Sequence, residues 1–82
     1  MGNLPIKYAE TARQLAEIVV DDFQNPEHRG DNYTPEFAAG YASRKLFLHF
    51  PKDVWERWGE PLERLCYEHA IEYHTKLDSE KS

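Results

Sequence analysis

The sequence predicts an all-α protein: a compact bundle-like domain of three main helices plus one short helix. Apolar residues recur every three or four positions over long segments, as on one face of a helix. Thr34, Pro35 and Glu36 form a typical helix start. No segment sustains the strict alternation of polar and apolar residues that marks a strand. We therefore expect packed helices around a single core.

The first helix is expected over residues 8–23. Its apolar stripe consists of Tyr8, Ala12, Leu15, Ala16, Val19 and Phe23. The charged residues on its other side are expected to face solvent, with Arg13 and Glu17 at ion-pair spacing; they are Glu10, Arg13, Glu17 and Asp21. Residues 24–33 contain Pro26, Gly30 and several Asn and Asp residues, which favour turns, so this segment is expected to be a loop.

The second helix should run over residues 35–47, with Thr34 as its N-cap and Pro35 at its first position. One stretch of this helix consists largely of the smallest residues, Ala38, Ala39, Gly40 and Ala42. Such a stretch lets another helix approach closely, either within the fold or across a dimer, and packing within the fold is the simpler interpretation. Residues 45–50 alternate in part, which makes a short strand the main alternative there.

A short third helix is expected over residues 52–58, followed by a break or a kink at Gly59 and Pro61. Whether these residues bend one helix or separate two is left open. The last helix should cover residues 61–77, and residues 78–82 form a polar tail that is expected to fray. Its inner stripe is Leu62, Leu65, Cys66, His69, Tyr73 and Leu77.

The composition indicates one small domain over residues 1–82, with 40% hydrophobic and 13% aromatic residues. A single cysteine excludes an intramolecular disulfide and favours a reducing compartment, the cytoplasm by default. No apolar run approaches the roughly 20 residues of a membrane span, so no membrane partner is expected.

The net charge of −5 is unevenly distributed. Residues 1–36 have seven acids and three bases, residues 37–52 have three bases and no acid, and residues 53–82 have eight acids and four bases. The basic centre allows a nucleic-acid-binding alternative through Arg44, Lys45 and Lys52, although three bases between acidic flanks are few for a phosphate backbone. The opposite alternative is an acidic DNA mimic that inhibits a nucleic-acid-binding enzyme.

Catalytic and metal-binding chemistry is not indicated. Cys66 and His69 share a helix face, but His74 is five residues further and should be rotated away, so the paired spacing of a zinc site is absent. Cys66 lies inside a helix, where acidic neighbours such as Glu63 and Glu68 would raise its thiol pKa. The four glycines are scattered and form no phosphate-binding loop. We expect no catalytic residues, no metal and no cofactor.

The two tryptophans are the best sequence candidates for a contact site. Trp55 and Trp58 are three residues apart on the short helix, with Arg57 beside them, and this is the composition of a binding hot spot. The sequence therefore predicts a non-enzymatic protein-protein interaction module, acting as an inhibitor, adaptor or regulator of a larger partner. A homodimer is a second form that such an interaction could take.

Overall fold

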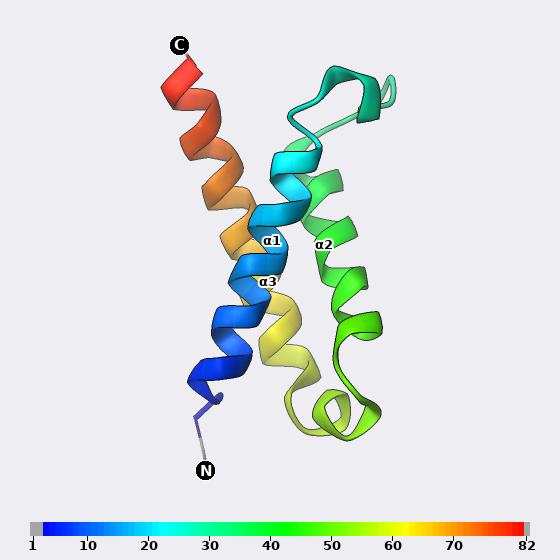
Figure 1. Cartoon of the computed structure of the whole chain (residues 1–82), viewed down its shortest axis with the longest axis vertical. Coiled ribbons are helices and arrows are strands. Elements are labelled where there is room, and N and C mark those ends of the chain that lie inside the picture. Colours follow the sequence, from blue (N-terminus) through cyan, green and yellow to red (C-terminus); the bar gives the residue numbers. More distant parts are fainter. Residues whose placement is uncertain (1–2, 82) are drawn as a thin grey trace.

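The computed structural model describes residues 3–81, and every regular element in that range is helical. Helix α1 is Ile6–Asp22, α2 is Pro35–His49 and α3 is Lys52–Lys81, with a short 3-10 turn at Pro26–His28 between α1 and α2. The predicted all-α, bundle-like fold is confirmed. Figure 1 shows α1 and α2 lying along α3, with the ends of the chain at opposite ends of the molecule.

Each of the three helices contacts the other two, in a molecule of 42 × 22 × 15 Å. Small side chains make up much of the core, so the helices lie close together. The members of the core are Ala12, Ala16, Val19, Val20, Phe23, Ala38, Ala39, Ala42, Leu46, Val54, Leu62, Cys66 and Ala70. Ala38, Ala39 and Ala42 of α2 are buried within the fold, the simpler of the two interpretations of this stretch, whereas Gly40 faces open space.

The start of α2 follows the sequence prediction. The Thr34 hydroxyl accepts the backbone N–H of Phe37 at 3.1 Å, and Pro35 occupies the first helical position. Thr34 thereby satisfies one of the four amide groups that a helix start leaves without partners. Helix α1 begins two residues earlier than expected, because the carbonyl of Pro5 accepts the N–H groups of Tyr8 and Ala9, both at 3.1 Å.

The connection between α1 and α2 is held by its own contacts. The side chain of Asn25 accepts the N–H of Glu27 at 3.0 Å, which caps the 3-10 turn. Arg29 Nε donates to the carbonyl of Phe23 at 2.5 Å, and its guanidinium lies 4.6 Å from the ring centre of Tyr33. Tyr33 in turn packs on Phe23, with the ring centres 5.3 Å apart. These contacts fix the loop against the end of α1.

The predicted short helix is not a separate element, because residues 52–58 form the first turns of α3. The helix continues through Gly59 and Pro61, and Figure 1 shows its first turns, in yellow-green, set at an angle to the remainder. Pro61 has no N–H to donate to the preceding turn, which is a usual cause of a bend. Gly59 is needed at the bend, since a Cβ there would lie 2.8 Å from the ring of Trp55.

Two further boundaries differ from the prediction. Residues 45–49 are helical, so the alternative of a strand at residues 45–50 is wrong. Helix α3 extends past the expected end at residue 77 as far as Lys81, and Ser82 lies outside the described residues. Within the described part of the chain, no helix combines the length and the apolar character needed to cross a membrane.

Candidate partner-binding surface

Exposed apolar side chains gather along α1 and α2. Seven large hydrophobic residues are exposed in the described chain, and four of them lie here: Ile18, Phe37, Tyr41 and Leu48. Leu48 is the most exposed, at 89%, and Ile18 is 63% exposed. We call the surface formed by Leu15, Ile18, Phe37, Tyr41, Arg44, Lys45 and Leu48 the α1–α2 face.

The spacing of residues on α2 explains why this stripe is exposed. Phe37, Tyr41 and Leu48 are separated by four and seven residues, which keeps them on one side of the helix. The buried side of α2 carries Ala39 and Leu46 instead, both fully buried. The helix therefore packs through its alanines and Leu46, while Phe37 and Tyr41 stay about half-exposed at the edge of the interface and meet Phe23 edge-on.

Shallow hollows connect the two helices across the face. The largest, of about 490 Å³, is lined by Ile18, Val19, Asp21, Asp22, Tyr41 and Lys45. Two smaller hollows, of about 260 and 240 Å³, adjoin it; Lys45 and Leu48 line both. Leu15 lines one of the smaller hollows and Tyr41 the other, so the face is one continuous, gently hollowed surface.

Charges of opposite sign border the face. Asp21 and Asp22 lie at the end of α1, where Asp21 accepts the Tyr73 hydroxyl at 2.8 Å. Arg44 and Lys45 lie on α2, and neither forms an ion pair within residues 3–81. Lys45 Nζ instead lies 5.1 Å from the ring centre of Tyr41, an attraction worth about 0.5–1 kcal/mol at an exposed site.

The predicted contact residues Trp55, Trp58 and Arg57 do lie together, on the first turns of α3. Both indoles are half-buried and pack against the core. Trp55 stacks on Phe47, with ring centres 3.8 Å apart and planes 17° apart, and its buried Nε1 has no partner among the described residues. Arg57 is exposed and lies 5.4 Å from the ring centre of Trp58. These residues secure the corner between α2 and α3, and their role in partner binding stays a prediction.

The alternative nucleic-acid-binding residues are only partly brought together. Arg44 and Lys45 are neighbours on α2, whereas Lys52 begins α3 and lies 3.8 Å from Glu56 in an exposed ion pair. Phe47, two residues after Lys45 on α2, stacks on Trp55. The three bases therefore lie on two different helices, and Lys52 is paired with an acid of its own helix.

His74 points to a different side of α3 from His69, as the five-residue step between them predicted. His74 is only 3% exposed and links two segments: its Nδ1 donates to Asp78 at 3.0 Å, and its Nε2 accepts the Tyr33 hydroxyl at 2.6 Å. A step of five residues from His69 turned His74 away from α1 but towards the α1–α2 connection. Burial also raises the pKa of the Tyr33 hydroxyl above its usual value, an effect that Arg29 partly opposes.

His69 and Cys66 follow the prediction in position. His69 is half-buried and its Nε2 donates to Glu17 Oε2 at 2.8 Å, so Glu17 faces α3 and not the solvent side expected from the sequence. Cys66 is fully buried as a small apolar residue. Burial raises the pKa of its thiol to about 12, a cause different from the acidic neighbours inferred from the sequence. A thiol so rarely ionised is a poor nucleophile.

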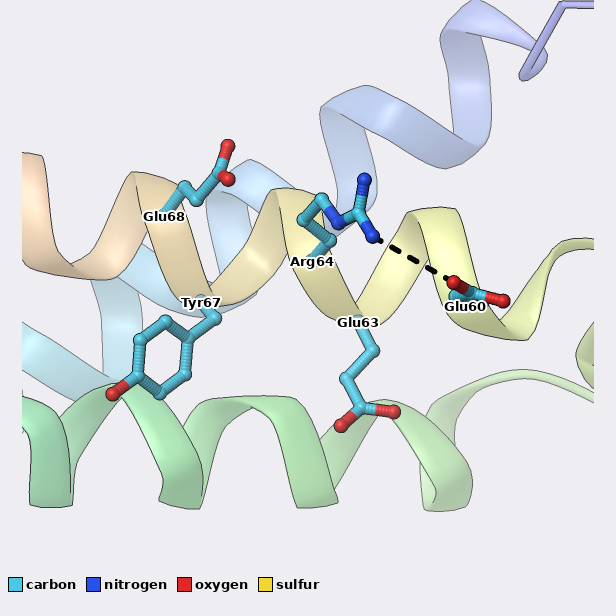
Figure 2. Close-up of a pocket in the computed structure, with 5 residues that line it drawn as sticks. All are labelled: Glu60, Glu63, Arg64, Tyr67 and Glu68. Atoms are coloured by element: carbon cyan, nitrogen blue, oxygen red, sulfur yellow. Dashed lines mark ion pairs between the residues drawn. The ribbon is translucent and has the colours of Figure 1, made fainter.

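A separate hollow of about 300 Å³ lies on α3 and is lined by Glu60, Glu63, Arg64, Tyr67 and Glu68. Figure 2 shows Glu63 and Tyr67 extending towards α2, while Arg64 and Glu68 lie on the other side of the helix. The only ion pair drawn there joins Arg64 and Glu60 at 3.6 Å. All five side chains come from α3 and are exposed, so this hollow is a solvated surface on which no catalytic groups converge.

Within residues 3–81, no group of three or more His, Cys, Asp or Glu residues is arranged to hold a metal ion. Comparison with protein families, with curated proteins and with solved structures found no match to this chain.

Proposed function

We propose that this protein acts by binding another protein, as an inhibitor, adaptor or regulator, and not by catalysis. The α1–α2 face is the observation that supports this. An exposed apolar patch bordered by charged residues is typical of interaction sites on small domains. Tyr41 and Arg44 belong to the residue types enriched in such contacts.

The internal polar contacts support the same proposal. His69 joins α3 to α1 through Glu17, and His74 joins α3 to the loop through Tyr33. Both histidines thus have partners that hold the fold together. Because catalysis by histidine needs a ring nitrogen in reach of a substrate, the burial of His74 favours a structural role for it.

An affinity pull-down from a lysate of the source cell, at two salt concentrations, tests the proposal. We expect the wild-type chain to retain a stoichiometric protein at high salt, because apolar contact resists salt. Leu48→Glu should lose that protein. Ile6→Glu is the matched control, since Ile6 is 75% exposed but lines none of the hollows of the face. No retained protein, or equal loss with both variants, would contradict the proposal.

The nucleic-acid-directed alternative has no supporting observation of its own. Tyr73 donates to Asp21 and His69 donates to Glu17, so two of the four acids of α1 are engaged within the fold. Retention of nucleic acid that disappears at high salt, and that an Arg44→Glu/Lys45→Glu double variant abolishes, would favour that alternative over the proposed function.

A further inference from the structure

We infer that one part of the α1–α2 face, formed mainly by the second half of α2, binds an acidic amphipathic helix of the partner protein. The inference rests on the proposed function and names the chemistry of the partner at that site. It depends on the coincidence of exposed apolar side chains with bases that have no acidic partner. We call this part of the face the basic patch; it is lined by Leu15, Tyr41, Arg44, Lys45, Leu48 and His49.

The basic patch consists of two hollows, of about 260 and 240 Å³, and none of the acids in the described chain lines either of them. The largest hollow of the face differs, because Asp21 and Asp22 line it together with Lys45. Both carboxylates have partners within the fold: Asp21 accepts the Tyr73 hydroxyl, and Asp22 lies 3.1 Å from His28 Nδ1. The basic patch therefore presents cations and apolar side chains without carboxylates of its own.

Acidic residues are absent from the sequence segment that carries most of the basic patch. The chain has 15 acids among its 82 residues, and residues 37–52 contain none. The same segment contains Tyr41, which is 42% exposed, and Leu48, which is 89% exposed. An acid beside these side chains would repel an acidic partner, whereas a surface that only faces water accepts acids as readily as bases. The acid-free surroundings of Leu48 therefore favour a partner of negative charge.

Arg44 and Lys45 have no acidic counterpart within the fold. Neither forms an ion pair among residues 3–81, and Lys45 Nζ lies 5.1 Å from the ring centre of Tyr41. Both bases precede the last turn of α2, where the basic residue is His49. Because the helix dipole acts mainly over the last turn, it does not account for these two bases. A carboxylate from a partner would pair with each of them.

The arrangement of the patch fits a helix of a protein. Tyr41, Lys45 and Leu48 follow one another at steps of four and three residues, so they lie on one side of α2. A partner helix along this side places apolar side chains on Leu15 and Leu48 and carboxylates on Arg44 and Lys45. Nucleic acid would gain little from contact with Leu48, and two cations are few for a phosphate backbone.

Two synthetic peptides of opposite charge test the inference. Each is about 14 residues long, or about 21 Å as a helix, and has leucines along one side. One peptide has glutamates beside the leucines, and the other has lysines at the same positions. Titration calorimetry of the full chain should show about tenfold or more tighter binding of the glutamate peptide, because only this peptide meets opposite charge at Arg44 and Lys45. Equal affinities, or no binding of the glutamate peptide up to millimolar concentration, would overturn the inference.

Charge reversal on the protein should exchange the two preferences. Arg44→Glu/Lys45→Glu should weaken binding of the glutamate peptide about tenfold or more and strengthen binding of the lysine peptide. Leu48→Ala should weaken both. Arg13→Glu is the matched control, because it reverses an exposed base of α1 that lines none of the hollows of the face, and it should change neither affinity. Circular dichroism should show wild-type helix content for all variants, and a double variant that keeps the wild-type preference would contradict the inference.

Other occupants are outcomes of the same measurements. A single-stranded DNA oligonucleotide that binds Arg44 and Lys45 more tightly than the glutamate peptide would overturn the acidic helix as occupant. Dimerisation of the wild-type chain through Leu48, measured by sedimentation equilibrium, would do the same. The lysate experiment separates this inference from the proposed function. A protein that is lost with Leu48→Glu but retained by the Arg44→Glu/Lys45→Glu variant supports the proposed function and overturns the acidic partner.

Discussion

The two sides of α1 are built differently. Towards α3, its polar side chains have partners within the chain: Glu17 accepts from His69, and Asp21 accepts from Tyr73, both at 2.8 Å. Towards α2, Ile18 is exposed and lines a hollow shared with Tyr41. Groups that are satisfied within the fold contribute to its stability, whereas exposed apolar groups gain only from contact with another molecule. The first side therefore holds the fold, and the second is available for association.

Side-chain size accounts for this difference. Ala38, Ala39 and Ala42 let α2 approach its neighbours closely, and all three are fully buried. The larger Phe37 and Tyr41 lie at the edge of that contact, where their rings meet Phe23 edge-on with ring centres 5.7 and 5.6 Å apart, and they are 55% and 42% exposed. Helix α2 thus packs through its alanines and Leu46, and its aromatic residues Phe37 and Tyr41 stay partly exposed.

The sharpest test of the comparison uses one substitution at two positions on α2. Leu46→Ala should lower the free energy of unfolding by about 2–5 kcal/mol, because Leu46 is fully buried and its removal leaves a cavity. Leu48→Ala should change it by less than about 0.5 kcal/mol, because Leu48 is 89% exposed. Urea unfolding of both variants at low protein concentration measures the two values. Similar losses at the two positions would break the distinction between core and face.

A smaller loss of stability is expected when the hydrogen bond between Tyr33 and His74, which joins the α1–α2 connection to α3, is removed. Tyr33→Phe keeps the ring against Phe23 but removes the hydroxyl bonded to His74. It should cost about 1–3 kcal/mol, because His74 is buried and its Nε2 would lose its partner. Hydrogen exchange should show faster opening of residues 24–34. An unaltered unfolding free energy would show that this contact does not stabilise the loop.

The smallest expected effect concerns Cys66 and Tyr73, whose protonation changes the stability of the fold only at alkaline pH. The pKa of Cys66 is raised to about 12 by burial, and that of Tyr73 to about 12, chiefly by its hydrogen bond to Asp21. Above the ordinary pKa values of 9.0 for a thiol and 10.0 for a tyrosine, and up to about 12, these two groups ionise in the unfolded chain while they stay protonated in the folded chain. Stability is therefore fully present below pH 9 and falls as pH rises towards 12.

Two single variants separate the contributions of Cys66 and Tyr73 to the loss of stability at alkaline pH. Cys66→Ala should cost about 1 kcal/mol at neutral pH, comparable to one buried methylene. Its melting temperature should then fall less steeply than that of the wild type above the thiol's ordinary pKa of 9.0. Tyr73→Phe should reduce the remaining slope. Parallel pH profiles for the wild type and both variants would contradict this assignment and would place the alkaline loss elsewhere.

Local sequence signals predicted most of the fold. Thr34 and Pro35 specify the start of α2 through their own geometry, so no tertiary contact is needed to place it. The end of the predicted short helix was misplaced because Gly59 and Pro61 usually interrupt helices. Here Gly59 leaves room for Trp55, and α3 bends without ending. The continuation of α3 through Gly59 depends on its close approach to Trp55, which the spacing of residues in the sequence does not reveal.

The candidate surface was harder to predict than the helices. The line through Phe37 and Tyr41 and the line through Ala38 and Ala42 are both compatible with a buried side of α2. Hydrophobicity alone favours burying the aromatic line, yet close packing of three helices selects the alanines. Hydrophobicity alone also made Trp55 a candidate contact residue, although its ring stacks on Phe47 within the fold.

The placement of the tryptophans determines what their fluorescence can report. The chain contains two tryptophans, Trp55 and Trp58, and both lie at the corner between α2 and α3. Emission from their indoles should follow the loss of the stack with Phe47 during unfolding. Neither indole lies on the α1–α2 face, so the same emission should stay constant while a partner binds there. Intrinsic fluorescence of these two tryptophans is therefore a probe of unfolding that does not respond to binding at the α1–α2 face.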